Sequence, residues 1–494
     1  MKRIWALPFI AGLALFSATL TPYSMLPPSY GTMYLFSQDT AKKYCTWNGH
    51  PTGLFADPQD IAYAIGNPSI FVVDKGHNKI TVIQIAPDGS IDTIINYGSG
   101  GNGENEFNAP TAITVLPNDF SAWYDYDIYV ADTKNNRLVN VWYSYNDRRY
   151  EWKSTVNSTN EGAVIYFNNP KDVASFWDPS YKSKGGSAVY LLDSGNKRFI
   201  KYSAGNLGSP YYIYSGEDSN GVHKRFGYPT SIAIHPNHIS ILSYDIYICD
   251  PPQRKVIFLR ETSTFSPPEW KAEIKFPEGK PVACATDGKA VYVLDNRNSK
   301  IIALAPDLSR TYFVFGGDGT DIYHFNFPAN VACDSVDTHY RLGIIENYTP
   351  WSGFKTYTPD LSNIPDDKPD LFYHTYDGFK TVVLRFYDRC SVEDYYEIWK
   401  KRNQYPWFVK ATIKAKPGQN YVEFVDTMII DGQSKISYKV RGTALDYRTA
   451  FSDSFTITTP RCFPPTITSI TFQDTIVKIN WDDNSYKNMA YCLI

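Results

Sequence analysis

The repeated phrase Phe-x-x-Pro is the feature of this sequence that most limits what the chain can fold into. After each copy comes an apolar run typical of a β-strand, and then a second apolar run that ends in an acid. Neighbouring copies lie between 47 residues (Pro281 to Pro328) and 60 residues (Pro110 to Pro170) apart, which leaves room for four short strands each. The phrase is Phe-x-x-Pro, and its copies begin at Phe55, Phe107, Phe167, Phe226 and Phe325, with a longer version from Phe276 to Pro281.

A second regularity joins each of these acids to a base five residues further on. We interpret the pair as a hairpin: the acid ends one strand and bonds turn amides, four residues reverse the chain, and the base opens the partner strand opposite the acid. The sixth copy has Glu346 in the acid position and no matching base, as expected of a terminal repeat. The five complete pairs are Asp74 with Lys79, Asp132 with Arg137, Asp193 with Arg198, Asp250 with Lys255, and Asp295 with Lys300.

Glycine-rich links precede several copies of the phrase, at residues 98–103, 215–221 and 316–319. A phosphate-binding loop needs a strand before it and a helix after it. Here a strand pattern follows, so we interpret the links as turns between neighbouring sheets.

Taken together, the glycine-rich link, Phe-x-x-Pro, the apolar strand and the acid-containing turn resemble the NHL repeat over about residues 50–350, most closely at Asp132 to Leu138. The resemblance implies a six-bladed β-propeller, which we place at residues 30–358. The last copy lacks sequence for an outermost strand. We expect residues 31–37 to supply it, so that deleting them opens the ring and exposes a sheet edge.

A second module follows a proline- and aspartate-rich linker at residues 359–370. Residues 371–460 contain about seven short alternating strands, which predict a β-sandwich. Tyr396-x-Ile398-Trp399 and Tyr438-x-Val440 resemble a fibronectin type III domain, with Phe386 where that family usually has Trp. Residues 463–494 resemble the start of a second such domain, too short to complete one, so we expect further modules beyond it.

The N-terminus has the pattern of an export signal. Met1-Lys2-Arg3 is followed by an apolar stretch at residues 4–16 and by small residues at 17–19, which predicts a signal peptide at residues 1–22. Pro8 and the shortness of the stretch argue against a membrane span. We therefore expect a mature chain without a span, either secreted or displayed at the cell surface.

Composition supports an all-β fold and excludes some partners. The chain has 39 Tyr, 28 Phe and 11 Trp but 5 Met, a bias toward residues that suit pleated sheets. The formal net charge is −3 and no Lys/Arg run exceeds three residues, so nucleic acid is not an expected partner. Seven cysteines in 494 residues are too few to form the framework of a small disulfide-rich fold.

Candidate binding residues stand directly after the repeat prolines, where the innermost strands of a propeller begin. They form a mixed polar rim that suits hydrogen bonding better than metal, and we expect no cofactor. Two other groups were weighed as metal ligands, the pair His235 and His238 and the acids near Asp125, and both are better interpreted as surface loops. The predicted ligand-binding residues are Gln59, Asp60, Thr111, Lys171, Asp172, Thr230, Ser231 and Asn330.

Two functions from different classes fit these patterns. The first is a non-enzymatic binding or scaffold protein whose propeller recognises a protein, peptide or glycan, with the sandwich modules as spacers. The alternative is a metal-dependent lyase or hydrolase sited in the channel, a class that the NHL resemblance includes. RNA binding, found in some intracellular NHL proteins, conflicts with the export signal and the negative charge.

Overall fold

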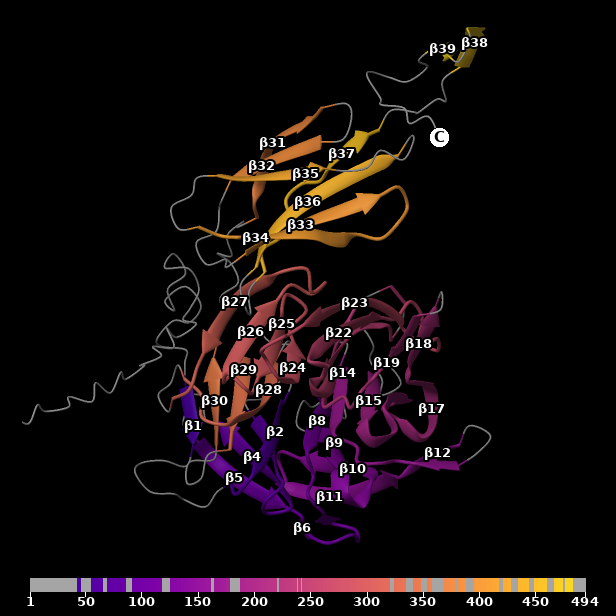
Figure 1. The fold of residues 1–494 in the computed structure, drawn as a ribbon. Coiled ribbons are helices and arrows are strands. Elements are labelled where there is room, and N and C mark those ends of the chain that lie inside the picture. The colour runs from indigo at the N-terminus through magenta and orange to yellow at the C-terminus, as the bar shows by residue number, and fades with distance from the viewer. Residues whose placement is uncertain are drawn as a thin grey trace, which may run out of the picture.

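The computed structural model shows an almost wholly β protein (Figure 1). The expected signal peptide and most of the expected linker at 359–370 lie outside the described residues. The structure describes residues 42–45, 55–64, 69–85, 91–117, 125–160, 164–177, 187–219, 222–237, 239–240, 242–319, 324–334, 341–347, 353–357, 368–377, 381–387, 395–416, 421–427, 434–443, 448–459, 466–473 and 476–482.

The described residues up to Tyr357 contain six four-stranded antiparallel sheets, numbered here 1 to 6. Sheet 1 has β2 (Pro58–Tyr63), β3 (Ser69–Asp74), β4 (Lys79–Ile85) and β5 (Ile91–Tyr97); sheet 2 has β8 (Ala112–Pro117), β9 (Asp125–Asp132), β10 (Arg137–Ser144) and β11 (Arg149–Val156); sheet 3 has β14 (Asp172–Trp177), β15 (Ser187–Asp193), β16 (Arg198–Ser203) and β17 (Asn206–Tyr214). Sheet 4 has β20 (Ser231–Pro236), β21 (Tyr244–Asp250), β22 (Lys255–Arg260) and β23 (Glu269–Lys275); sheet 5 has β24 (Pro281–Thr286), β25 (Val291–Asp295), β26 (Lys300–Leu304) and β27 (Thr311–Gly316); sheet 6 has β28 (Pro328–Asp334), β29 (Arg341–Glu346), β30 (Gly353–Tyr357) and β1 (Lys42–Cys45).

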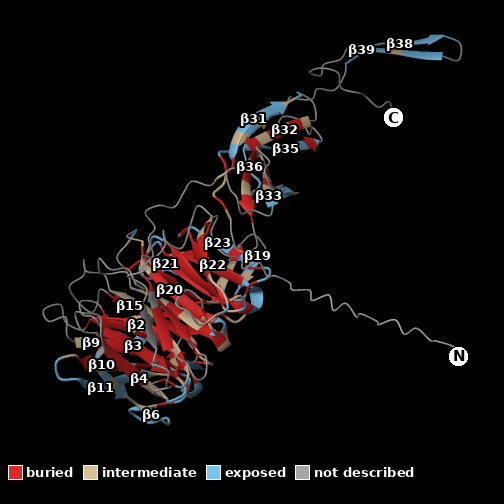
Figure 2. Ribbon diagram, turned by 90° about the vertical axis from the view of Figure 1, so that its left-hand side faces the viewer, coloured by how far each residue is buried: buried red, intermediate tan, exposed pale blue. Residues whose placement is uncertain are grey.

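The first strand of each sheet contacts the first strand of the next in a closed order: β2, β8, β14, β20, β24, β28 and back to β2. This is a propeller-like arrangement. The faces between neighbouring sheets are apolar and buried (Figure 2). Tyrosines fill much of this space, because Tyr126, Tyr190 and Tyr292 are all fully buried between sheets. The bias toward Tyr therefore serves the core of the molecule.

The predicted acid–base hairpins have the expected register. Asp132 is opposite Arg137 across the β9–β10 turn, and the other four pairs are opposite each other in the same way. Three of the turns contain a 3₁₀ helix: Thr133–Asn135, Ser194–Asn196 and Pro251–Gln253.

The acids do more than end strands, because each is buried and bonds the Phe-x-x-Pro segment of its own repeat. Asp132 accepts a hydrogen bond from the backbone N–H of Asn108 at 2.7 Å, and from the Arg137 guanidinium at 2.7 Å. Asp193 repeats this with Asn168 and Arg198, both at 2.7 Å. The Phe-x-x-Pro segment and the acid–base turn of one repeat therefore contact each other through the buried acid.

Sheet 6 departs from the expectation of a degraded repeat. Glu346 accepts the N–H of Asn326 at 2.7 Å, as the aspartates do in other sheets. Its base is Lys355, at 2.9 Å, which comes from β30 instead of from the end of the turn. The sequence search missed Lys355 because it was confined to the position five residues after the acid.

The outermost strand of sheet 6 comes from the N-terminal part of the chain. β1 pairs antiparallel with β30, and Tyr44 is opposite Phe354. The segment expected to do this, residues 31–37, lies outside the described residues. The strand that occupies this edge in the structure is Lys42–Cys45, closer to the first repeat.

The glycine-rich links were expected to be turns, but Ser99–Gly100 and Gly216–Ser219 within them form short strands. Two glycines of the links have a specific packing role. Gly98 (φ 98°) and Gly316 (φ 100°) each lie against the ring of the next repeat phenylalanine. A Cβ at Gly316 would lie 2.4 Å from the ring of Phe325. Only glycine combines the left-handed backbone with this close approach.

The second module has two antiparallel sheets that enclose one buried cluster, which includes Phe386, Tyr396 and Tyr438. The three-stranded sheet has the order β31 (Asp370–Tyr376), β32 (Thr381–Tyr387), β35 (Tyr421–Thr427). The four-stranded sheet has the order β34 (Phe408–Lys414), β33 (Tyr395–Arg402), β36 (Lys435–Thr443), β37 (Phe455–Thr458).

Four small two-stranded pairs complete the described strands: β6 (Ser99–Gly100) with β7 (Glu106–Phe107), β12 (Ser158–Asn160) with β13 (Val164–Tyr166), β18 (Gly216–Ser219) with β19 (Val222–Arg225), and β38 (Thr466–Gln473) with β39 (Ile476–Asp482). Across the described ranges, we find no helix with the length and apolar character of a membrane span.

Candidate functional site

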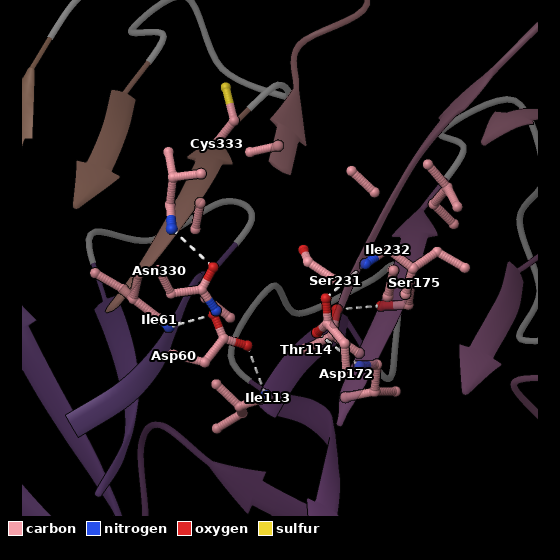
Figure 3. Close-up of a pocket in the computed structure, with 18 of the residues that line it drawn as sticks. Asp60, Ile61, Ile113, Thr114, Asp172, Ser175, Ser231, Ile232, Asn330 and Cys333 are labelled. Atoms are coloured by element: carbon pink, nitrogen blue, oxygen red, sulfur yellow. Dashed lines mark hydrogen bonds between the residues drawn. The ribbon is translucent and has the colours of Figure 1, made fainter. Parts of the chain in front are cut away.

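A cavity of about 150 Å³ lies where the innermost strands of the six sheets meet (Figure 3). All six strands contribute lining residues, from Asp60 on β2 to Cys333 on β28. The cavity is therefore a property of the ring and of no single repeat.

The eight predicted binding residues fall into two layers. Gln59, Thr111, Lys171 and Thr230 come directly after the repeat prolines, are half-buried and do not line the cavity; this set is named the mouth layer here. One residue further along the chain, Asp60, Asp172, Ser231 and Asn330 line the cavity and form the inner layer.

Asp60 in the inner layer joins three sheets. Its Oδ2 accepts the N–H of Ile113 on β8 at 2.8 Å, and its Oδ1 accepts the side-chain amide of Asn330 on β28 at 2.8 Å. Oδ1 also accepts the N–H of Ile61, the next residue in the chain, at 2.7 Å. The carboxylate thus bonds sheet 1 to sheets 2 and 6.

Asp172 has the same role two sheets further on. It accepts the N–H of Val173 at 2.8 Å and the N–H of Ile232, on β20 of sheet 4, at 2.7 Å. Ser231 accepts the N–H of Cys284 at 3.1 Å and so bonds sheet 4 to sheet 5. The inner layer consequently holds neighbouring sheets together.

Burial controls the charge of the two aspartates. Removal from water raises the pKa of Asp172 to about 7, because the hydrogen bonds from Ile232, Ser231 and Val173 only partly offset it. The pKa of Asp60 is raised well above its usual value, first by burial and then by the charge of Asp172. Two carboxyl groups in one cavity therefore resist ionising together near neutral pH.

The mouth layer is partly engaged in similar contacts. The Thr111 hydroxyl donates to the carbonyl of Lys171 at 2.8 Å, and the Thr230 hydroxyl donates to the carbonyl of Val282 at 2.7 Å. Gln59 donates to Asp57 at 2.6 Å, and Lys75 bonds the other oxygen of that carboxylate at 2.7 Å. Thr111 and Thr230 thus bond to the following sheet, whereas Gln59 bonds within its own segment.

Lys171 differs from its neighbours in the mouth layer. Its backbone bonds to Leu192 and Thr111, but among the described residues no acceptor bonds its ammonium group. Burial, and then the charge of Lys75, lowers its pKa. A half-buried cation without a carboxylate beside it is open to a ligand.

Sequence analysis missed several residues that line the cavity, namely Thr114, Ser175, Thr286, Cys284 and Cys333. Thr114 and Ser175 share a hydrogen bond of 2.7 Å between sheets 2 and 3. They lie further along the innermost strands, on the face that points inward. Following the two-residue period from Ala112 would have identified Thr114, but Ser175 lies three residues after Asp172, so the period does not reach it.

The structure brings together no metal-binding set of three or more His, Cys, Asp or Glu residues within the described ranges. His235 bonds the carbonyl of Pro236 at 3.0 Å and packs against Phe176. Its suggested partner, His238, lies outside the described residues.

Comparison with known proteins gives structural likenesses only. No family model matches the chain, and no curated protein matches it. Solved structures with similar folds include the PQQ-bound aldose sugar dehydrogenase of Streptomyces coelicolor (12% identity, TM-score 0.39, 64% of this chain and 98% of that one) and a luciferin-regenerating enzyme (10%, 0.40, 64% and 94%). They also include the Dos1 propeller (9%, 0.33, 61% and 67%). Likenesses at this level carry no inference about function.

Proposed function

We propose that this chain is an exported binding or scaffold protein. A six-bladed propeller of the NHL type recognises a protein, peptide or glycan ligand at the mouth of its central cavity. The fibronectin type III-like module at 371–460, and the start of another at 463–494, act as spacers. Export through a signal peptide at residues 1–22 places the mature chain outside the cytoplasm, secreted or at the cell surface.

The division of the polar residues into two layers carries this proposal. The inner layer holds the sheets together, and a cavity of about 150 Å³ is small beside the roughly 300–1,000 Å³ of typical small-molecule pockets. The mouth layer is half-exposed and stands on a rigid ring of sheets, where binding residues commonly collect. Recognition at the mouth fits this geometry better than enclosure of a ligand.

Binding arrays of peptides and glycans test the proposal, with Lys171→Met as the site variant. The control is Lys153→Met, which removes the same charge on the outermost strand of sheet 2. We expect saturable binding of one ligand class by the wild-type chain, loss of that binding in Lys171→Met, and retention in Lys153→Met. Equal binding by both variants, or no saturable binding by the wild-type chain, would contradict the proposal.

One observation favours the alternative, an enzyme sited in the channel. An aspartate whose pKa is near 7 can give or take a proton at neutral pH, and perturbed carboxyl groups in cavities are common in active sites. Metal analysis of the purified chain, with turnover of peptide and sugar derivatives measured before and after chelation, tests it. Stoichiometric metal together with turnover that chelation abolishes would establish the enzyme in its metal-dependent form.

A further inference from the structure

We propose that the face of the ring at the cavity mouth binds an acidic polypeptide segment through a circle of cations, one from each of the acid–base turns. This rests on the proposed function, because it names the partner of the same mouth. The cations are Lys75, Lys134, Lys197, Arg254 and Arg297.

The five acid–base turns each carry a net positive charge. Each has four residues between its buried acid and its base, and each contains one Lys or Arg and no Asp or Glu. The turns are residues 75–78, 133–136, 194–197, 251–254 and 296–299, named here the turn face. The whole chain has a net charge of −3, so the positive turn face is a local departure from the average.

Three of the five cations are available to a partner. Lys134, Lys197 and Arg297 are exposed, and no carboxylate of a described residue pairs with them. Lys75 is paired with Asp57, and Arg254 donates to the carbonyl of Pro277. Lys171 in the mouth layer adds a half-buried ammonium inside the circle.

Contacts along the ring place the turns on one face. Each buried aspartate bonds its turn to the Phe-x-x-Pro segment that leads into the innermost strand, so every turn lies at the mouth end of its sheet. Turns also bond to the following sheet. Asn78 accepts the N–H of Ala109 at 2.7 Å, and Asn136 accepts the N–H of Asn169 at 2.7 Å.

The backbone of the turns is fixed before any partner arrives. Asn136, Lys197 and Arg254 have φ between 50° and 54°, and each donates its N–H to the first residue of its turn. A fixed backbone reduces the entropy lost on binding, and the separation of the cations is set by the ring. The arrangement suits an extended chain that carries several carboxylates.

An acidic polypeptide fits this face better than a nucleic acid. Proteins that bind single-stranded nucleic acids combine a basic groove with aromatic side chains on which the bases stack. The five turns contain no Phe, Tyr or Trp. They offer point charges and amides, which match carboxylates and peptide carbonyls.

The test measures binding of a fluorescent oligoglutamate to the purified full chain by anisotropy. Oligoglutamine of the same length and a single-stranded oligothymidylate of the same charge are the comparison probes. We expect oligoglutamate to bind with an affinity that falls as salt is added, and oligoglutamine not to bind. The charge-reversing double variant Lys134→Glu/Lys197→Glu is expected to weaken binding about tenfold, because it replaces two exposed ion-pair contacts with like-charge repulsion.

Two further variants make the result specific. Lys153→Glu/Lys271→Glu reverses the same number of charges on the outermost strands β11 and β23, and is expected to bind oligoglutamate like the wild-type chain. Lys134→Gln/Lys197→Gln removes the charges without reversing them and is expected to give an intermediate loss. Thermal melts show whether each variant is folded.

Three results would overturn the inference: no binding of oligoglutamate at low salt, equal losses in the turn and outer-strand variants, or tighter binding of the oligothymidylate. None of them would by itself contradict the proposed function. If the arrays yield a neutral ligand that depends on Lys171 while oligoglutamate does not bind, the mouth is a binding site and only the identity of its partner is wrong.

Discussion

At the scale of the residue, buried carboxylates perform two separate tasks. Asp132 and its equivalents at the ends of the second strands bond each turn to its own Phe-x-x-Pro segment. Asp60 and Asp172 bond one sheet to the next inside the cavity. The hairpin between acid and base was visible in the sequence, because the two residues are close along the chain, but the bond between Asp132 and Asn108 was not, because they are 24 positions apart. The bonds inside the cavity were not visible either, because Asp60 and Ile113 belong to different repeats.

Replacing Asp132 with Asn tests the first task. The amide keeps the size of the side chain but cannot accept from both Asn108 and Arg137, which leaves a guanidinium only about a tenth exposed without its carboxylate. Breaking such a pair costs about 3–5 kcal/mol. Denaturant unfolding is expected to show a loss of this size in Asp132→Asn and almost none in the exposed Asp92→Asn. Similar stability of the two variants would contradict this role.

Asp172 predicts how stability depends on pH. Its pKa is near 7 in the folded state and near 4 when unfolded, so the folded state binds the extra proton between these values. The stability that it contributes is complete below about pH 4 and is lost as the pH rises through about 7. Thermal melts from pH 4 to 8 are expected to show a smaller decline in melting temperature for Asp172→Asn than for the wild-type chain, even though the variant is less stable at each pH. Parallel pH profiles for the two proteins would refute the assignment.

At the scale of the element, local patterns gave the hairpins and their register, since four turn residues and an acid–base pair suffice to define them. Pairing between distant segments was harder to predict. β1 and β30 are more than 300 residues apart, and a four-residue strand carries little pattern of its own. The segment chosen from sequence, residues 31–37, was selected because it precedes the first Phe-x-x-Pro as residues 94–97 precede the second, whereas pairing at a sheet edge requires mainly backbone hydrogen bonds.

Two truncations test the closing strand. Removing residues 1–37 leaves β1 intact, so the melting temperature is expected to stay close to that of the mature chain. Removing residues 1–46 deletes β1 and exposes the edge of β30, which is expected to lower the melting temperature and promote aggregation. If the two truncated chains have the same melting temperature, β1 does not contribute to closure of the ring.

At the scale of the whole molecule, the six sheets and the cavity between them set where function can lie. The repeat spacing in the sequence predicted the number of strands in each sheet, because each copy must bury its apolar faces against its neighbours. It could also locate the mouth, because the repeat prolines mark the start of every innermost strand. It could not separate the mouth layer from the inner layer. That division depends on bonds such as Asp60 to Asn330, which join residues 270 positions apart.

The most direct test of the account is a set of distances between spin labels on the turn face, measured in solution by pulsed electron resonance. Labels carried by a non-natural amino acid at Lys134, Lys197, Arg254 and Arg297 avoid the seven native cysteines. In a closed ring of six sheets, the three adjacent pairs should be nearly equal. The pair two sheets apart, Lys134 with Arg254, should then be about 1.7 times as far, and the opposite pair, Lys134 with Arg297, about twice as far. Distances that grow in proportion to the number of sheets between the labels, or ratios that fit a different number of sheets, would contradict both the ring and the binding face placed on it.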